Sequence, residues 1–344
     1  MAWFVCFRPC WRIGRSKVAA SPPLLSVVIP CYNGELWLSR AIDSILTQQC
    51  DWVEVVVVND GSTDGTGEIM AGYGSRIVPV QQANSGVARA RRTGVRSARG
   101  EYVKFLDADD VIPTGALSAL SAFIHQFPGE ALLGRAQEIT EDGEIAGNRM
   151  YVIGYTPEHL SLLKNEYLLT QATHSSLWTI PRSLFETKAI FCESPPMLGE
   201  EYDFCIRLIE SGIPIRYIDQ VVSFIRGHAG VGRLSSTRDE TRHLRQARQL
   251  QTVATFITER LPGHEPCAIL RLAELAWSQG RHCLRMQMKL AAAEYFRIAR
   301  EINPEVEPVG SRTYRVLSLA YGPERSERIL ECAKKLNAVR KRWR

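Results

Sequence analysis

Three carboxylates stand together at the end of an apolar run, within residues 105–110. If the run is a strand, side-chain alternation sends Asp107 and Asp109 to the same side, where their charges repel one another unless a cation neutralises them. Carboxylate oxygens are hard ligands that suit Mg²⁺ or Mn²⁺. The segment therefore predicts a divalent-cation site, and the alternative is a solvated acidic turn.

Two polar loops, residues 32–35 and 59–65, directly follow the first two apolar runs. Open α/β sheets bind ligands outside the carboxyl ends of their strands, which is where these loops would lie. Neither loop has the GxGxxG pattern of a nicotinamide-binding unit or the GxxxxGK[ST] pattern of a P-loop NTPase. Asp60 and Asp64 also suit turns and helix starts, and we expect one of them to act as a cap.

The elements that must position these groups alternate β-branched runs with helix-period segments, a pattern typical of βαβ units on a parallel sheet. The expected fold class is therefore α/β, with a doubly wound first half. Further along, a hairpin turn is expected at 141–143, and the chain becomes helical after residue 237. The predicted strands are 26–30, 53–58, 76–80, 102–106 and 221–226, and the predicted helices begin near residues 38, 87, 183 and 200.

The bulk composition narrows the class of protein. The 344 residues are 45% hydrophobic and 23% charged, which excludes a disordered chain. A net charge of +5 suits a phosphate-bearing ligand or an anionic membrane, and it falls well short of a nucleic-acid footprint, so no nucleic-acid partner is expected. The nine cysteines form no CxxC pair, and neither a signal peptide nor a membrane helix is evident. We therefore expect a cytoplasmic protein.

Several short motifs stand in the order of a known family. They occupy residues 28–33, 58–64, 84–86, 90–94 and 106–110. In this respect the chain resembles the family 2 glycosyltransferases of GT-A fold, over roughly residues 25–228. The resemblance implies a Rossmann-like, mostly parallel sheet flanked by helices. It also implies sugar transfer, with inversion, from a nucleotide-diphosphate donor, with a bias to UDP, onto a hydroxyl acceptor in polysaccharide or glycoconjugate synthesis.

The resemblance also assigns residues to the donor site. Tyr32 and Asp60 would bind the nucleotide base, with Arg91 near the base or the pyrophosphate. Asp107 would touch the ribose, and Asp109 of the DXD motif would hold Mn²⁺ or Mg²⁺ on the donor phosphates. The other residues expected to bind the donor are Pro30, Asn33, Glu35 and Ala108.

The expected general base departs from the family. Residues 198–208 resemble its Glu-Asp segment, in which the Asp opens a helix and removes the acceptor's proton, but here that position holds Glu201. Glutamate is one methylene longer, which shifts the basic oxygen by about 1 Å. Asp203 is the next candidate. The alternative is that these acids only complement the helix dipole.

Two histidines are further candidates. In similar enzymes a histidine at the position of His228 can contact the metal or the phosphates, although a lone histidine is more often structural. His174 and Trp178 could help shape a sugar subsite, and core packing explains Trp178 equally well.

We expect three regions. Residues 1–22 form a basic segment, residues 23–236 form the GT-A domain, and residues 237–344 form a helical region. The GT-A domain divides into a nucleotide-binding half (23–112) and an acceptor half (113–236). Gly280, Ala292, Phe296, Ala299 and Pro304 have the spacing of one tetratricopeptide repeat, but no second copy follows, which favours an accessory bundle.

The basic tail, residues 334–344, predicts peripheral contact with anionic lipid at the inner membrane face, where a lipid-linked or other saccharide acceptor would be found. A solvated helix end explains the tail equally well.

Three other functions remain open. They are a nucleotidyltransferase, although its glycine- and lysine-rich phosphate loop is absent, a catalytically weakened sugar- or nucleotide-binding protein, and a scaffold formed by the helical region.

Overall fold

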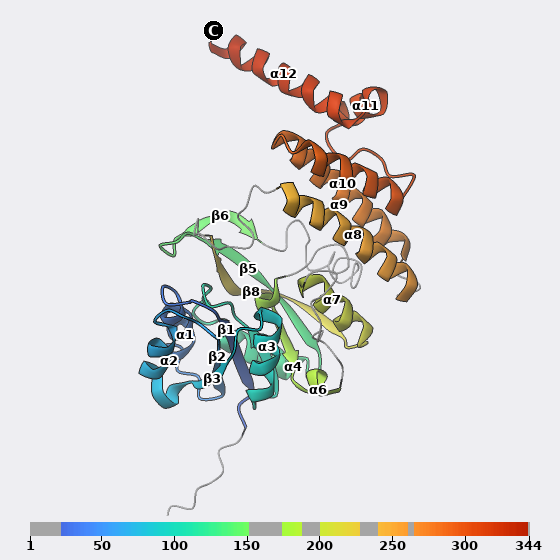
Figure 1. Ribbon diagram of the computed structural model, residues 1–344. Coiled ribbons are helices and arrows are strands. Elements are labelled where there is room, and N and C mark those ends of the chain that lie inside the picture. Colours follow the sequence, from blue (N-terminus) through green and yellow to red (C-terminus); the bar gives the residue numbers. More distant parts are fainter. Residues whose placement is uncertain (1–21, 151–173, 188–199, 228–239, 261–264, 343–344) are drawn as a thin grey trace, which may run out of the picture.

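The computed structural model describes residues 22–150, 174–187, 200–227, 240–260 and 265–342. A central sheet is flanked by helices, a group of helices follows beyond it, and the last helix extends away from the rest (Figure 1). This mixed α/β architecture, with a mostly parallel central sheet and helices at the C-terminus, agrees with the predicted fold class.

The first half of the sheet is parallel. Its strand order is β3-β2-β1-β4, so the chain runs outward from β1 and then returns to the other side of it. Ligands of open α/β sheets bind at such a switch point, outside the carboxyl ends of the two central strands. The strands are β1 (Leu25–Cys31), β2 (Val53–Asp60), β3 (Val78–Gln82) and β4 (Tyr102–Phe105).

Two apolar layers cover the sheet. Alternate residues of β1 point to opposite faces, so Val27 joins the layer of α1, α2 and α4, while Val28 joins the layer of α3 and α7. The valine-rich strand β2 is buried on both faces, as its sequence predicts. The helices are α1 (Leu38–Leu46), α2 (Thr66–Tyr73), α3 (Val87–Ser97), α4 (Ala116–Gln126) and α7 (Glu200–Glu210), and a 3-10 turn, η1 (Gly74–Arg76), precedes β3.

The second half of the sheet is mixed. Strand β7 joins β4 and β5 in antiparallel pairing, and β5 also pairs with β6 across the predicted turn, where Gly143 has a φ of 96°. Strand β8 runs parallel to β5 and is longer than the predicted segment. The bounds are β5 (Ala131–Ile139), β6 (Ile145–Met150), η2 (Ser175–Leu177), β7 (Trp178–Pro181), α6 (Ser183–Thr187) and β8 (Ile215–Arg226).

The helical region packs against the α3 and α7 face, because its buried residues belong to the same apolar cluster. Helices α9 and α10 form a hairpin whose turn lies at residues 286–288, so Gly280, which the repeat-like spacing placed at the turn between helices, lies within α9 instead. Trp277 meets Phe296 edge to face, with ring centroids 5.1 Å apart, and a Cβ at Gly280 would lie 3.0 Å from the Phe296 ring. The helices are α8 (Glu240–Arg260), α9 (Glu265–Arg285), α10 (Lys289–Ile302), α11 (Arg312–Tyr321) and α12 (Pro323–Arg342).

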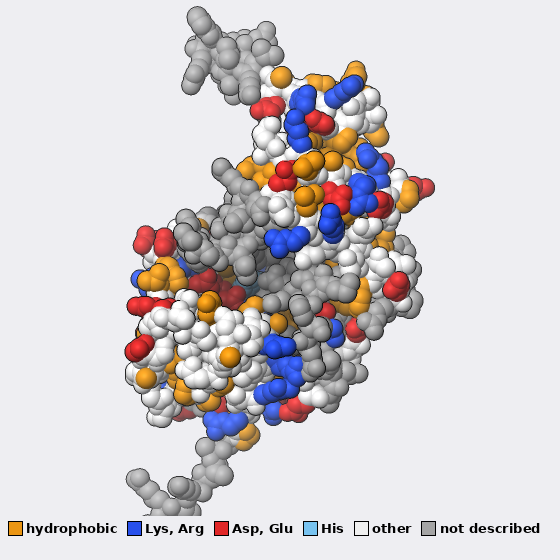
Figure 2. Space-filling view, viewed as in Figure 1, with side chains coloured by type: hydrophobic (Ala, Val, Ile, Leu, Met, Phe, Trp, Pro, Cys, Tyr) orange, Lys and Arg blue, Asp and Glu red, His pale blue; other side chains and the backbone are white. Residues whose placement is uncertain are grey.

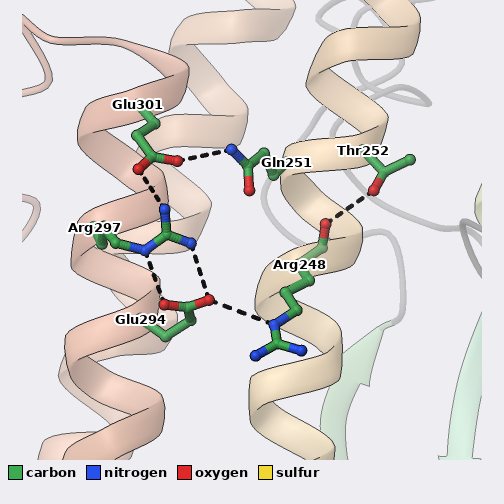
Figure 3. Close-up of polar contacts among 6 residues, drawn as sticks. All are labelled: Arg248, Gln251, Thr252, Glu294, Arg297 and Glu301. Atoms are coloured by element: carbon green, nitrogen blue, oxygen red, sulfur yellow. Dashed lines mark hydrogen bonds and ion pairs between the residues drawn. The ribbon is translucent and has the colours of Figure 1, made fainter.

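Polar contacts also join α8 to α10 (Figure 3). Gln251 Nε2 of α8 donates to Glu301 of α10 at 2.7 Å, and Arg248 of α8 lies 3.6 Å from Glu294 of α10. Within α10, Glu294 also accepts two hydrogen bonds from Arg297, both 2.9 Å long. Glu240, the first residue of α8, accepts the backbone N–H groups of Leu290 and Ala291 and so satisfies the start of α10. Among the described residues, no helix is both long and apolar enough to cross a membrane.

Candidate functional site

The loops after β1 and β2 are joined at the carboxyl edge of the sheet. The N–H of Asn33 donates to Ser62 Oγ, and the N–H of Thr63 donates to Asn33 Oδ1, both at 2.9 Å. Glu35 makes two further bonds with the same loop, of 3.0 and 3.1 Å. Asn33 adopts a φ of 52°, a conformation that asparagine tolerates. Asn33 and Glu35 therefore shape the loops that would meet a donor, and direct contact with the donor stays a prediction.

Asp60, at the end of β2, organises a third loop. Its side chain is buried, and its oxygens accept hydrogen bonds from Gln82 Nε2 (2.7 Å) and from the N–H groups of Ser85 and Gly86 (2.9 Å each). Gly86 has a φ of 88°, which glycine adopts without strain just before α3 begins. Asp60 therefore holds the entry to α3 against β2. Asp64 satisfies the N–H of Thr66 at the start of α2, as expected for one of these two acids.

Asp107 is held from two sides. Arg91, buried in α3, donates from Nη2 to Asp107 Oδ1 at 2.9 Å, and His174 Nε2 lies 3.4 Å from Oδ2. Burial raises the pKa of Asp107, but the charges of Arg91 and His174 and the hydrogen bond from Arg91 outweigh it and hold the pKa below its ordinary value. An ionised carboxylate in a fixed orientation can accept hydrogen bonds from sugar hydroxyls.

The acidic motif itself is a turn. Strand β4 ends at Phe105, and the N–H of Asp110 donates to the carbonyl of Asp107 at 3.0 Å. The expectation that strand alternation aligns Asp107 with Asp109 is therefore wrong, because that alternation holds only within a strand.

A cation could fit at this turn. Among the described residues, ligand atoms of Asp107, Asp110 and His174 lie within 4.8 Å of one another. Carboxylate oxygens with one imidazole nitrogen suit a divalent cation such as Mn²⁺. These three residues therefore fit the divalent metal that the sequence implies. The predicted ligand Asp109 is half-buried in the same turn but does not belong to this group, so its role as a ligand stays a prediction.

Arg226 fixes the acidic turn to the end of β8, a role that sequence reasoning missed. Its N–H donates to Asp110 Oδ1 and its Nε to the carbonyl of Asp109, each at 3.0 Å. The guanidinium also lies over the Trp37 ring, 4.8 Å from its centroid. In the sequence, the only signal for this role is an arginine at the end of an apolar strand, and this signal does not indicate which residues the arginine contacts.

The remaining donor residues lie around the same edge. Pro30 is buried in β1, Ala108 is half-buried, and Tyr32 is 53% exposed. The Tyr32 ring is therefore exposed at this edge of the sheet, and its contact with a base stays a prediction. In the space-filling view, acidic side chains gather at a hollow between the sheet and the helical region, while basic side chains line the outer face of α3 (Figure 2).

The predicted catalytic residues are less completely defined. The backbone of Glu201 lies in the first turn of α7, but its side chain is outside the described set, and His228 lies wholly outside the described residues. Asp203, the alternative base, receives a 2.8 Å hydrogen bond from Arg207 one turn along the helix. Trp178 is fully buried and packs edge to face on Phe204, which supports the core-packing explanation over a sugar subsite.

Comparisons with known proteins find related sequences and structures. Residues 26–187 match the family model described as glycosyl transferase family 2. The chain is 34% identical over 151 residues to the glycosyltransferase GlyA of Streptococcus pneumoniae. The aligned region covers 42% of this chain and 21% of GlyA. The chain spans between about a fifth and about a third of the length of the first curated relatives that it matches.

Solved structures share the fold. The structure of Staphylococcus aureus TarS 1–349 in complex with UDP-GlcNAc superposes with a TM-score of 0.61 at 20% identity, covering 91% of this chain and 92% of that one. The mannosyltransferase PcManGT of Pyrobaculum calidifontis, in complex with GDP-Man and Mn²⁺, superposes with a TM-score of 0.52 at 18% identity, covering 92% and 81%. The chain therefore carries a family 2 glycosyltransferase domain of GT-A fold.

Proposed function

We propose that the chain transfers a sugar from a nucleoside-diphosphate donor, with UDP preferred, to an acceptor hydroxyl with inversion at the anomeric carbon. The observation that carries the proposal is the ionised Asp107, held between Arg91 and His174 at the switch point of the sheet. The nucleotide-sugar complexes of TarS and PcManGT, which share the fold, support a donor of this class.

The mechanism assigns separate tasks to the two halves of the site. Tyr32, Asp60 and Asp107 orient the nucleoside, and Asp109, with His228, would hold a Mn²⁺ or Mg²⁺ ion. When bound, this cation supplies Lewis-acid stabilisation of the diphosphate leaving group. Glu201 removes the proton of the acceptor hydroxyl, whose oxygen attacks the anomeric carbon as the bond to the diphosphate breaks. A single displacement inverts the anomeric centre.

The acceptor is a saccharide or a lipid-linked saccharide of surface polysaccharide or glycoconjugate synthesis, and the protein works in the cytoplasm at the inner membrane face. The basic composition of residues 334–344 supports contact with anionic lipid, at about 1 kcal/mol for each basic residue near the surface. Sedimentation with phosphatidylglycerol vesicles should exceed that with phosphatidylcholine vesicles, and removal of the tail should abolish the difference. Equal sedimentation with both vesicles would contradict the membrane contact.

A thermal-shift screen of nucleotide sugars with Mn²⁺ tests the proposed function, because a bound donor stabilises only the folded state. A stabilising donor is then assayed for hydrolysis without acceptor. Binding with hydrolysis supports the transferase. Binding without hydrolysis or transfer favours the catalytically weakened binding protein, and absence of binding across UDP, GDP and other nucleotide sugars contradicts both.

A further inference from the structure

His174 lies beside the predicted ribose ligand although it comes from a distant part of the chain. It directly precedes η2, 67 positions after Asp107, and its Nε2 is 3.4 Å from Asp107 Oδ2. Its side chain is 24% exposed, so it forms part of the wall of the site rather than of the core. None of the motifs that define the donor site includes this residue.

The hydrogen bonds of His174 determine which ring nitrogen carries the proton. Nδ1 accepts the backbone N–H of Ser176, and it lies 2.7 Å from Ser176 Oγ. A backbone N–H can only donate, so in the neutral ring Nδ1 is the unprotonated nitrogen. Nε2 then carries the proton, and this nitrogen lies 3.4 Å from Asp107 Oδ2, within ion-pair distance. His174 therefore presents a polar N–H to the carboxylate even as a neutral ring.

A buried polar cluster fixes the turn that carries His174. The carbonyl of Ser176 accepts a hydrogen bond from Lys104 Nζ and another, of 2.9 Å, from Ser223 Oγ. Lys104 Nζ also donates to Ser223 Oγ at 3.2 Å, and all three residues are fully buried. A buried polar group is costly when it lacks a partner, so these bonds favour one arrangement of β4, η2 and β8.

We infer that His174 is a positioning residue which, opposite Arg91, fixes the Asp107 carboxylate for the ribose hydroxyls of a nucleoside diphosphate. Arg91 donates a hydrogen bond to Oδ1, and His174 Nε2 lies 3.4 Å from Oδ2, so rotation of the carboxylate would break the charged hydrogen bond from Arg91 and the contact with His174. The inference rests on the proposed function, and it adds a residue that acts on the donor through Asp107.

The test measures the Kd of UDP and of 2′,3′-dideoxy-UDP, each with Mn²⁺, by calorimetry. Wild type should bind UDP more tightly than the dideoxy analogue. His174→Ala should weaken UDP by about tenfold, the usual value of a hydrogen bond to a charged group, and should bind the two nucleotides almost equally. His174→Gln, whose amide N–H can also reach Asp107, should recover most of the discrimination. His125→Ala is the matched control, because His125 is an exposed histidine on α4 whose ring nitrogen Nδ1 hydrogen-bonds to the carbonyl of Ser121 in the same helix.

Each outcome decides the matter. If His174→Ala folds and still discriminates between the two nucleotides as wild type does, His174 does not position Asp107. If His174→Ala does not fold, His174→Gln decides alone, since loss of discrimination in that folded variant also contradicts the inference. A rise in the Mn²⁺ half-saturation with unchanged ribose discrimination would make His174 a metal ligand instead. If wild type binds UDP and GDP not at all, the proposed function fails rather than this inference.

Discussion

In the donor half of the sheet, side chains from α3 and from the ends of β2 and β4 meet through buried or half-buried hydrogen bonds. Helices α8 and α10 instead meet through an ion pair and a hydrogen bond at a more exposed surface. The carboxylate of Asp60 accepts hydrogen bonds from Gln82 at the end of β3 and from two N–H groups of the loop that follows. Arg297, by contrast, is 47% exposed between its two glutamates. Substitutions should therefore be costly for function and stability in the first region and tolerated in the second.

Asp109→Asn in the donor half should have the largest effect. Removing one charge from the predicted metal ligand should lower kcat/KM by about 10³-fold, the range for losing a preorganised electrostatic contact, with an unchanged unfolding midpoint. Steady-state transfer assays over a range of Mn²⁺ concentrations measure the effect. The matched control is Asp142→Asn, on the exposed turn between β5 and β6, which should behave as wild type. Full turnover of wild type in excess chelator would exclude the metal role.

Glu201→Gln should have the second-largest effect on transfer. It keeps the size of the side chain but ends proton abstraction, so transfer should fall by about 10²-fold while the donor Kd barely changes. Glu201→Asp pulls the carboxylate back by about 1 Å and should fall between wild type and the Gln variant. Asp203→Asn is the control, because Asp203 is paired with Arg207. If Asp203→Asn loses transfer and Glu201→Gln keeps it, Asp203 is the base.

Two glycines of the donor half, one packed tightly against the sheet and one with open space beside it, test how closely this region is packed. A Cβ at Gly94, in α3, would lie 2.2 Å from Val28 Cγ1, so Gly94→Ala should lower the free energy of unfolding by about 1–3 kcal/mol through overpacking. A Cβ at Gly67, in α2, would meet nothing within 4 Å. Gly67→Ala should therefore raise stability by about 0.5–1 kcal/mol. Urea titrations measure both, and equal effects of the two substitutions would contradict the packing described here.

Lys104 should give the donor half a distinct pH dependence. Burial lowers the pKa of Lys104 from 10.5 to about 7, although the charge of Asp110 opposes the shift. Between pH 7 and pH 10 the unfolded chain therefore binds a proton that the folded chain has released, so stability rises with pH, by up to about 1.4 kcal/mol per unit. Urea titrations from pH 6 to 9 should show this slope in wild type and lack it in Lys104→Met. Identical slopes would mean that the buried amine does not titrate there.

The smallest effect is expected in the helical region. Arg297→Ala removes contacts to Glu294 and Glu301 on a largely exposed surface, so it should cost less than about 1 kcal/mol. The loss should shrink further in 0.5 M NaCl, because salt screens exposed charges. Urea titrations at low and high salt provide the measurement. A cost comparable with that of Gly94→Ala would show that the two regions do not differ as proposed.

Much of the fold followed from local patterns. Strand β2 was predicted because a strand buried on both faces leaves an unbroken apolar run in the sequence. Helix α1 was predicted because a helix buried on one face leaves apolar residues at helical spacing. The end of β4 was placed one residue late, so strand alternation was applied to Asp107 and Asp109, which lie in a turn where it does not hold. Apolar periodicity continues to Leu106 and contains no signal for where hydrogen bonding to the next strand stops.

The site was predictable only where its residues are close in sequence. The cluster of carboxylates at 107–110 indicates a site by its composition, and the turn motif around Asp60 indicates that this residue belongs to a ligand-binding loop. These partners of Asp107 and Asp110 could not be predicted, because His174, just before η2, and Arg226, at the end of β8, lie more than 60 residues further along the chain. Their positions depend on the pairing of β4 with β7 and of β5 with β8, which no local pattern specifies.

The central claim is that a nucleoside diphosphate binds at the carboxyl ends of β1, β2 and β4. A crystal structure of the protein with UDP and Mn²⁺ tests this claim most directly. The account predicts the uracil beside Tyr32 and Asp60, the ribose hydroxyls within hydrogen-bond distance of Asp107, and the metal at the turn of Asp109. A nucleotide bound elsewhere, or a ribose directed away from Asp107, would contradict it.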